Sequence, residues 1–207
     1  EEGYHVKIFD RIDSPWKKKG QEMFVGDLLD TELLNKAIVG AETVYNFAAL
    51  ADLDLARSKP LETAEINILG NIKALEACRA NGIKRFIFAS TVYVYSREGS
   101  FYRCSKQAAE NYIEEYQRTY NLDYTILRYG SLYGPRADMS NGLFRIVKNA
   151  LETGVVSYEG SPDALREYIH VEDAAKASVK ALGDEFRNQS FVLTGQEPMR
   201  VADLLKM

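Results

Sequence analysis

Short apolar runs alternate with longer helical runs along the first two thirds of the chain. The short runs are apolar on both faces, as strands buried between two helix layers are. Such alternation predicts an α/β fold in which helices cover both faces of a parallel, doubly wound sheet. The expected strands are 5–10, 23–25, 43–48, 85–90 and 124–127, and the expected helices are 31–38, 60–81 and 102–120.

Composition restricts the class of protein. The 207 residues, 46% of them hydrophobic and 27% charged, suit one sizeable globular domain or slightly more. A net charge of −4 argues against a nucleic-acid surface. The two cysteines have no metal-ligand spacing, which predicts free thiols and a reducing compartment. No apolar run reaches the ~18 residues of a membrane span and no signal peptide opens the chain, so we expect a cytoplasmic protein.

Thr91, Tyr102 and Lys106 together can form a proton-transfer device. Residues 85–91 read as a buried strand that ends in two hydroxyls, and a helical run follows from Tyr102. Residues four apart share one helix face, so the phenol and the ammonium can converge. A nearby cation would lower the Tyr pKa from about 10 toward the range that suits acid–base catalysis. Because almost one Tyr/Lys pair with this spacing is expected by chance in a chain of this composition, the pair is informative only together with the other motifs.

Asp10 closes the first expected strand. In dinucleotide-binding folds an acid at the end of the second strand accepts the ribose hydroxyls, about 20 residues after a glycine-rich fingerprint. Counting back from Asp10 places those glycines before residue 1. We therefore expect the sequence to lack the first strand and the phosphate-binding loop. The alternative for Asp10 alone is a turn-forming acid at a strand end.

Five further motifs follow in order. Asp27-Leu28 and Phe47-Ala48-Ala49 end the next two strands, Asn67 lies in the middle of a helix, and 127–136 and 166–173 come later. In this combination the chain resembles the extended short-chain dehydrogenase/reductase family, of the NAD-dependent epimerase/dehydratase type, over essentially its whole length. The resemblance implies a Rossmann-type fold that is incomplete at the N-terminus and carries a smaller C-terminal substrate lobe.

The resemblance also implies roles for individual residues. Asp10 would bind the adenosine ribose of NAD, and its charge would disfavour a 2′-phosphate. Tyr102 would be the acid/base, Lys106 would hold the nicotinamide ribose and depress the Tyr102 pKa, and Thr91 would hydrogen-bond the reacting oxygen. The remaining residues implied to bind the cofactor are Asp27, Leu28, Phe47, Ala48, Ala49 and Tyr129.

The residues implied to bind substrate narrow the chemistry. Family members that eliminate water or carbon dioxide typically carry acids directly after the Thr91 position, but Val92 and Tyr93 stand here, which disfavours a dehydratase or decarboxylase. Tyr93 would donate a hydroxyl to the substrate or, equally, pack as a buried ring. Arg166 resembles the arginine that contacts a nucleotide-sugar diphosphate, with a surface ion pair as the alternative. Ser131 stands where nucleotide-sugar enzymes often have Asn.

Two domains are expected. Residues 1–130 with about 165–183 would form the dinucleotide-binding domain, and 131–164 with 184–207 a truncated substrate lobe. That lobe would lie over the C-terminal edge of the sheet, where open α/β sheets bind ligands. It is expected to contain a helix at 142–153, the segment 155–158 and a strand at 191–194, while a further helix starts at 171.

The residues and the resemblance together predict an NAD-dependent epimerase or dehydrogenase. We expect it to act on a secondary alcohol of a nucleotide-sugar, by hydride transfer with a Tyr/Lys/Thr proton relay. Two alternatives stay open: an NAD(P)-dependent reductase of a non-nucleotide carbonyl compound, and a truncated non-catalytic module. No nucleic acid, membrane or metal is expected as a partner. A homodimer is expected through helices 60–81 and 102–120, with Ile68, Ile72, Leu75, Ala108, Tyr112 and Tyr116 as candidate contacts.

Overall fold

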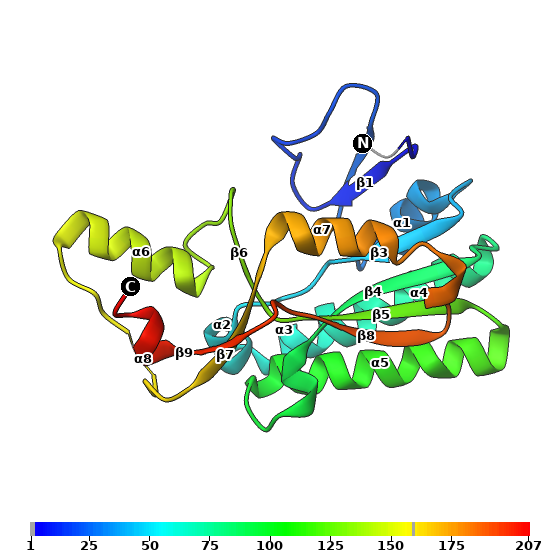
Figure 1. The fold of residues 1–207 in the computed structure, drawn as a ribbon. Helices are drawn as coiled ribbons and strands as arrows, with labels where there is room; N and C mark the ends of the chain where they lie inside the picture. Colours follow the sequence, from blue (N-terminus) through cyan, green and yellow to red (C-terminus); the bar gives the residue numbers. More distant parts are fainter. Residues whose placement is uncertain (1–2, 159) are drawn as a thin grey trace. The chain divides into compact units, whose positions relative to one another are not determined.

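The structure is a computed structural model that describes residues 3–158 and 160–207. The chain divides into two compact units (Figure 1). Unit 1 comprises Glu1–Ile126 with Arg187–Gln189, and unit 2 comprises Leu127–Phe186 with Ser190–Met207. The domain boundaries expected from the sequence stay a prediction.

Unit 1 is built on parallel strands, as the sequence predicted. β1 (Lys7–Asp10) pairs with β2 (Glu22–Val25), and β3 (Thr43–Asn46) pairs with β4 (Arg85–Thr91), each in parallel. β5 (Asp123–Tyr129) follows β4 in the strand order β3-β4-β5-β8, and its first four residues belong to unit 1. β4 is buried almost along its whole length, which explains why its sequence is apolar on both faces.

The helices of unit 1 are α1 (Thr31–Ile38), α2 (Leu53–Ser58), α3 (Pro60–Ala64), α4 (Gly70–Ala80) and α5 (Ser100–Tyr120). A π-helical turn, η1 (Glu65–Leu69), joins α3 to α4, so the helix expected at 60–81 is helical throughout but widened in its middle. Helix α2 was not predicted. Its six residues are too few for a clear apolar period, and the Asp52 carboxylate caps it by accepting from Leu55 N at 2.8 Å.

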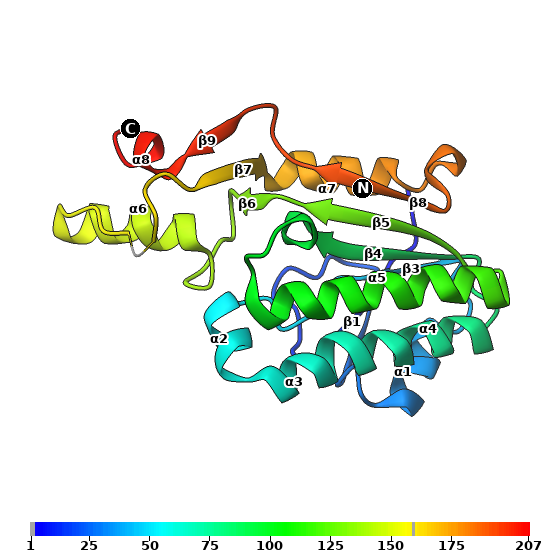
Figure 2. The same cartoon turned by 90° about the horizontal axis from the view of Figure 1, so that it is seen from below.

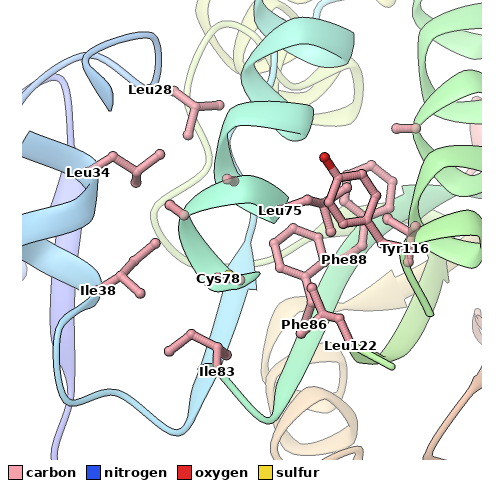
Figure 3. Close-up of a cluster of buried hydrophobic side chains, with 14 of the residues drawn as sticks. Leu28, Leu34, Ile38, Leu75, Cys78, Ile83, Phe86, Phe88, Tyr116 and Leu122 are labelled. Carbon is pink, nitrogen blue, oxygen red and sulfur yellow. The ribbon is translucent and has the colours of Figure 1, made fainter. Parts of the chain in front are cut away.

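The core of unit 1 lies where the helices meet β4. Figure 2 shows α4 and α5 side by side, and Figure 3 shows Leu34 and Ile38 of α1 facing α4. Leu75 of α4 packs with Phe86 and Phe88 of β4, and all three are at most 1% exposed. Each such burial contributes about 1.5–3 kcal/mol, so this cluster stabilises the scaffold around the end of β4.

The two cysteines of the chain differ sharply in reactivity. Cys78 is buried in the core and burial raises its thiol pKa to about 12, whereas Cys104 is exposed on α5. Because the thiolate is the reactive form, only Cys104 is expected to react with a disulfide reagent in the native protein near pH 8. Thiol titration should give about one equivalent per chain before denaturation and two after it. Two equivalents without denaturant would contradict the buried position of Cys78.

Part of the predicted dimer surface is internal to unit 1. Leu75 is 0% exposed and Tyr116 is 9% exposed, and both belong to the core, so they are wrong as partner contacts. Helical spacing identified the apolar stripe of α4 and α5 correctly but could not separate the side facing the sheet from the outer side. Tyr112 is 45% exposed and keeps its place in the predicted interface.

Unit 2 contains short strands that the sequence did not predict. β6 (Ser131–Tyr133) runs parallel to β7 (Leu165–His170), and β7 pairs antiparallel with β9 (Pro198–Arg200). Its helices are α6 (Gly142–Thr153), α7 (Val171–Lys180) and α8 (Val201–Leu204). Most of β8 (Gln189–Leu193) also belongs to this unit and matches the strand expected at 191–194, whereas 155–158 forms neither helix nor strand. In the described residues, no helix has the length and apolarity needed to cross a membrane.

Candidate active site

Thr91 is the last residue of β4 and caps the turn that follows this strand. It is 5% exposed, and its Oγ1 accepts a hydrogen bond from Tyr93 N at 3.3 Å. The 3₁₀ turn η2 (Val92–Tyr95) follows, and Gln107 of α5 fastens it by donating to Val94 O at 2.8 Å. Gly99, at φ +91°, lies so close that an added Cβ would be 3.0 Å from Tyr93 Cβ and Cγ. Tyr93 is therefore packed against the first turn of α5.

Tyr102 and Lys106 lie one helical turn apart on α5, next to the end of β4. The Lys106 side chain is buried, and its Nζ donates to Ala89 O at 2.6 Å. The same nitrogen is 4.5 Å from the centroid of the Phe88 ring and 5.7 Å from that of the Tyr102 ring. The structure thus brings Tyr102 and Lys106 together. It also places Lys106 against Ala89 of β4, two residues before Thr91.

Burial controls the ionisation of both groups. Burial, followed by the neighbouring Tyr93 phenol, raises the pKa of Tyr102 to about 12. Burial also lowers the pKa of Lys106 to about 7, against the opposing effect of Glu110. The prediction that Lys106 depresses the Tyr102 pKa is therefore wrong for this structure. Desolvation of the phenolate is the main cause, and Lys106, whose Nζ bonds to Ala89 O, is not among the groups that shift the Tyr102 pKa.

The Tyr102 hydroxyl is available to an external partner. Within residues 3–158 and 160–207 no protein atom hydrogen-bonds to it. By contrast, the Tyr116 hydroxyl donates to Glu76 Oε1 at 2.7 Å, and the Tyr129 hydroxyl lies 2.5 Å from Ser178 Oγ. At neutral pH the Tyr102 phenol is protonated, so it is poised to donate a proton to an oxygen placed beside it.

Asn67, at the centre of the π-helical turn, connects the end of β3 to the Tyr102 helix. Its Oδ1 accepts from Leu50 N at 2.7 Å, while its Nδ2 donates to Leu50 O at 3.1 Å and to Ser105 Oγ at 2.9 Å. Ser105 Oγ in turn donates to Tyr102 O at 2.8 Å. Asn67 therefore makes these bonds from a π-helical turn, a feature that occurs frequently at functional sites.

Asp10 and Asp27 are exposed at the ends of β1 and β2. Each carboxylate accepts one backbone hydrogen bond from its own turn: Asp10 from Ile12 N at 3.3 Å, and Asp27 from Leu29 N at 2.8 Å. Their other oxygen sites stay open. Leu28, which was expected to flank the adenine, has its side chain in the core at 9% exposure. The side chain packs over Gly70, where an added Cβ would be 2.7 Å from Leu28 Cδ2, and its place beside the adenine stays a prediction.

The end of β3 presents a small-residue surface. Ala48 is exposed, Ala49 is partly buried, and Phe47 is 58% exposed with its ring stacked on Tyr45 at 5.7 Å between centroids. Asn46 shapes this turn by accepting from Ala48 N at 3.1 Å and donating to Asn71 Oδ1 at 2.9 Å. Sequence reasoning missed the roles of Asn46 and Asn71. Two asparagines in apolar segments, a type that is seldom buried without partners, were the available signal.

Three predicted site residues belong to unit 2. Tyr129 is buried and its hydroxyl is engaged with Ser178 of α7, so its implied contact with the cofactor is not evident within this unit. Ser131 pairs with Tyr168, and Arg166 lies two residues before Tyr168, so both side chains lie on one face of the β6–β7 pair. In the described residues no ion pair occupies the Arg166 guanidinium, which donates to Leu165 O at 3.1 Å.

Known proteins resemble this chain in fold and in sequence. A sequence model described as "NAD dependent epimerase/dehydratase family" matches residues 1–193. The structure of the UDP-glucose 4-epimerase of Thermotoga maritima, with UDP-glucose, has a TM-score of 0.90 at 26% identity over 99% of this chain and 74% of that one. The Thermus thermophilus UDP-glucose 4-epimerase, in complex with NAD, has a TM-score of 0.88 at 28% identity over the same shares. This similarity confirms the predicted Rossmann-type α/β fold.

Curated relatives extend beyond this chain. A trifunctional Arabidopsis thaliana enzyme that includes UDP-glucose 4,6-dehydratase is 27% identical over 98% of this chain but only 34% of its own length. The UDP-glucuronate 4-epimerase of Thermodesulfobacterium geofontis is 28% identical over 79% of this chain and 55% of its own. The chain therefore spans about a third to a half of these relatives. Because the family match extends over nearly the whole sequence, the chain belongs to the NAD dependent epimerase/dehydratase family.

Proposed function

We propose that the protein is an NAD-dependent epimerase or dehydrogenase that acts on a secondary alcohol of a nucleotide-sugar. One observation carries this proposal: the Tyr102 hydroxyl, without a protein partner in the described chain, lies on the same helix face as the buried Lys106, at the end of β4. Acid–base chemistry at a carbinol needs a proton donor and acceptor of this kind. The relatives named as UDP-sugar epimerases support the substrate class.

The residues at the strand ends fit the cofactor. Asp10 and Asp27 keep open carboxylate oxygens for the adenosine ribose and the adenine amine, and exposed Ala48 with Ala49 allows close approach to the backbone. Lys106 is proposed to hold the nicotinamide ribose. When bound, NAD supplies a hydride acceptor. The carboxylate of Asp10 would repel a 2′-phosphate, which favours NAD over its phosphorylated form.

Tyr102 and Thr91 are proposed to handle the proton. With its pKa raised to about 12, Tyr102 holds its proton at neutral pH and can donate it to the oxygen of a keto intermediate as that carbon takes back a hydride. The phenolate left behind would accept the hydroxyl proton of the next substrate as its carbinol carbon gives up a hydride. Thr91 Oγ1 accepts from Tyr93 N, which leaves its own hydroxyl hydrogen free to point at the reacting oxygen. Val92 and Tyr93, which follow Thr91, provide no carboxylate for a second proton transfer. The site therefore supports epimerisation or simple oxidoreduction rather than elimination of water.

Substrate binding is proposed for Tyr93, Ser131 and Arg166. Arg166 suits a diphosphate because its planar guanidinium donates two parallel hydrogen bonds and has no carboxylate partner among the described residues. The serine at position 131 donates through one hydroxyl where an amide would offer two groups, so it provides a weaker contact.

Binding and turnover of UDP-sugars test this function. In the protein as it is naturally produced, UDP-glucose at about 100 times its dissociation constant is expected to stabilise the fold by about 2.7 kcal/mol, measured as a thermal shift. Conversion at the sugar C4 position would be followed by chromatography. A shift with non-nucleotide carbonyl compounds but none with UDP- or dTDP-sugars would favour the reductase instead. Titration of the 207-residue chain with NAD separates both enzymes from a non-catalytic module, which would not bind.

A further inference from the structure

A second polar pair lies one helical turn beyond Lys106. Glu110 of α5 is 6% exposed and Ser90 of β4 is 3% exposed. Ser90 Oγ donates a hydrogen bond to Glu110 Oε1. Ser90 directly follows Ala89, whose carbonyl oxygen accepts from Lys106 Nζ. Two consecutive residues of β4 therefore bond two residues of α5 that are four apart, immediately before Thr91.

The charges around Lys106 single out Glu110. A buried ammonium is costly unless a nearby opposite charge compensates it. Glu110 is on the same helix face and raises the Lys106 pKa against burial. Tyr102 is the other titratable group beside the lysine, and β4 contributes a Phe88 ring, a carbonyl and a hydroxyl. In the described parts of α2, α3, α4 and η1, which also pack on α5, no charged group shifts the Lys106 pKa.

We propose that Glu110 is a positioning residue for Lys106. Held by Ser90, its carboxylate supplies a buried negative charge one helical turn from Lys106 that favours the ammonium form of the lysine. The inference rests on the proposed function of Lys106 and extends it, because it assigns the control of that lysine to a pair that touches neither substrate nor cofactor in the proposed site.

Two substitutions separate this role from simple fastening of α5 to β4. Glu110→Gln keeps the size of the side chain and an oxygen that accepts from Ser90, but it removes the charge. Ser90→Ala removes the hydrogen bond and leaves the carboxylate in place. If Glu110 only fastens the helix, the Lys106 titration should change more in Ser90→Ala. If Glu110 is a counter-charge, the Lys106 titration should change more in Glu110→Gln.

The decisive measurement is the titration of Lys106 by NMR in protein labelled in its lysine side chains, with Lys106→Met to assign the signal. In Glu110→Gln the midpoint is expected to fall by about one pH unit or more, because an opposite charge nearby typically contributes that much. Ser90→Ala should move it less, and Glu114→Gln, one turn further along α5, should leave it unchanged. An unmoved midpoint in Glu110→Gln, or an equal shift in Ser90→Ala, would overturn the proposal.

Glu110→Asp covers the case in which Glu110→Gln does not fold. Aspartate restores the charge on a shorter side chain, so the Lys106 midpoint should stay close to that of the unchanged protein, and a fall as large as one pH unit would count against the counter-charge. These titrations need no substrate. If Tyr102→Phe kept full turnover, the proposed function would fail, yet the Lys106 midpoints would still decide the role of Glu110.

Discussion

Replacing Tyr102 with Phe is expected to lower turnover by about 10²- to 10⁴-fold, the usual contribution of one general acid–base group. The hydroxyl has no hydrogen-bond partner in the described part of the protein, so its removal should leave the fold and its stability nearly unchanged. The ring itself stays in place beside Lys106. Steady-state assay with a UDP-sugar, together with denaturant unfolding, measures both effects on the same preparation.

Tyr116→Phe is the matched control for this experiment. It also removes one tyrosine hydroxyl from α5, but that hydroxyl donates to Glu76 Oε1 at 2.7 Å in a cluster with Arg79. Losing a hydrogen bond to a charged group costs about 1.5–3 kcal/mol, so Tyr116→Phe should destabilise the protein while turnover persists. The reverse pattern, with activity retained in Tyr102→Phe, would remove Tyr102 from the chemistry.

The scaffold was predictable because its signals are local. The apolar runs that became β3, β4 and β5 and the helical stretch that became α5 follow from residue type and period. The strands β6, β7 and β9 were missed. Two of them have three residues, and a run that short carries no usable period. The π-helical turn around Asn67 also has no signature in residue type, since it depends on the bonds that Asn67 makes to Leu50 and Ser105.

The positions of the site residues were easier to predict than their electrostatics. Spacing alone placed Tyr102 and Lys106 on one helix face, and the structure brings them together. The direction of the Tyr102 pKa was wrong, because spacing does not reveal how deeply a group is buried and desolvation dominates here. The Ser90–Glu110 pair lies between elements distant in sequence, so only the fold reveals it. The packing of Leu28 on Gly70 was likewise not visible in the sequence, because it depends on the fold.

Lys106→Met is expected to abolish most of the turnover and to remove a specific pH dependence of stability. The pKa of Lys106 is about 7 in the folded protein, below its ordinary value of 10.5. Between these values the unfolded chain binds more protons, so the free energy of unfolding rises with pH across this window. From about pH 6 to about pH 9 this single group contributes a rise of about 2.5 kcal/mol.

Comparing pH slopes, rather than absolute stabilities, isolates that contribution. Lys106→Met also leaves Glu110 without its buried counter-charge and frees Ala89 O, and both effects change stability by amounts that do not follow the lysine titration. Tyrosine and cysteine groups whose pKa is raised by burial, such as Cys78, are common to both proteins and cancel in the difference. Guanidinium unfolding should be measured for the unchanged protein and for Lys106→Met at about pH 6, 7.5 and 9. The difference between their free energies of unfolding should change by about 2.5 kcal/mol over this range. A constant difference would mean that Lys106 stays protonated throughout this range, and that its ammonium is stabilised more strongly than the burial and Glu110 together imply.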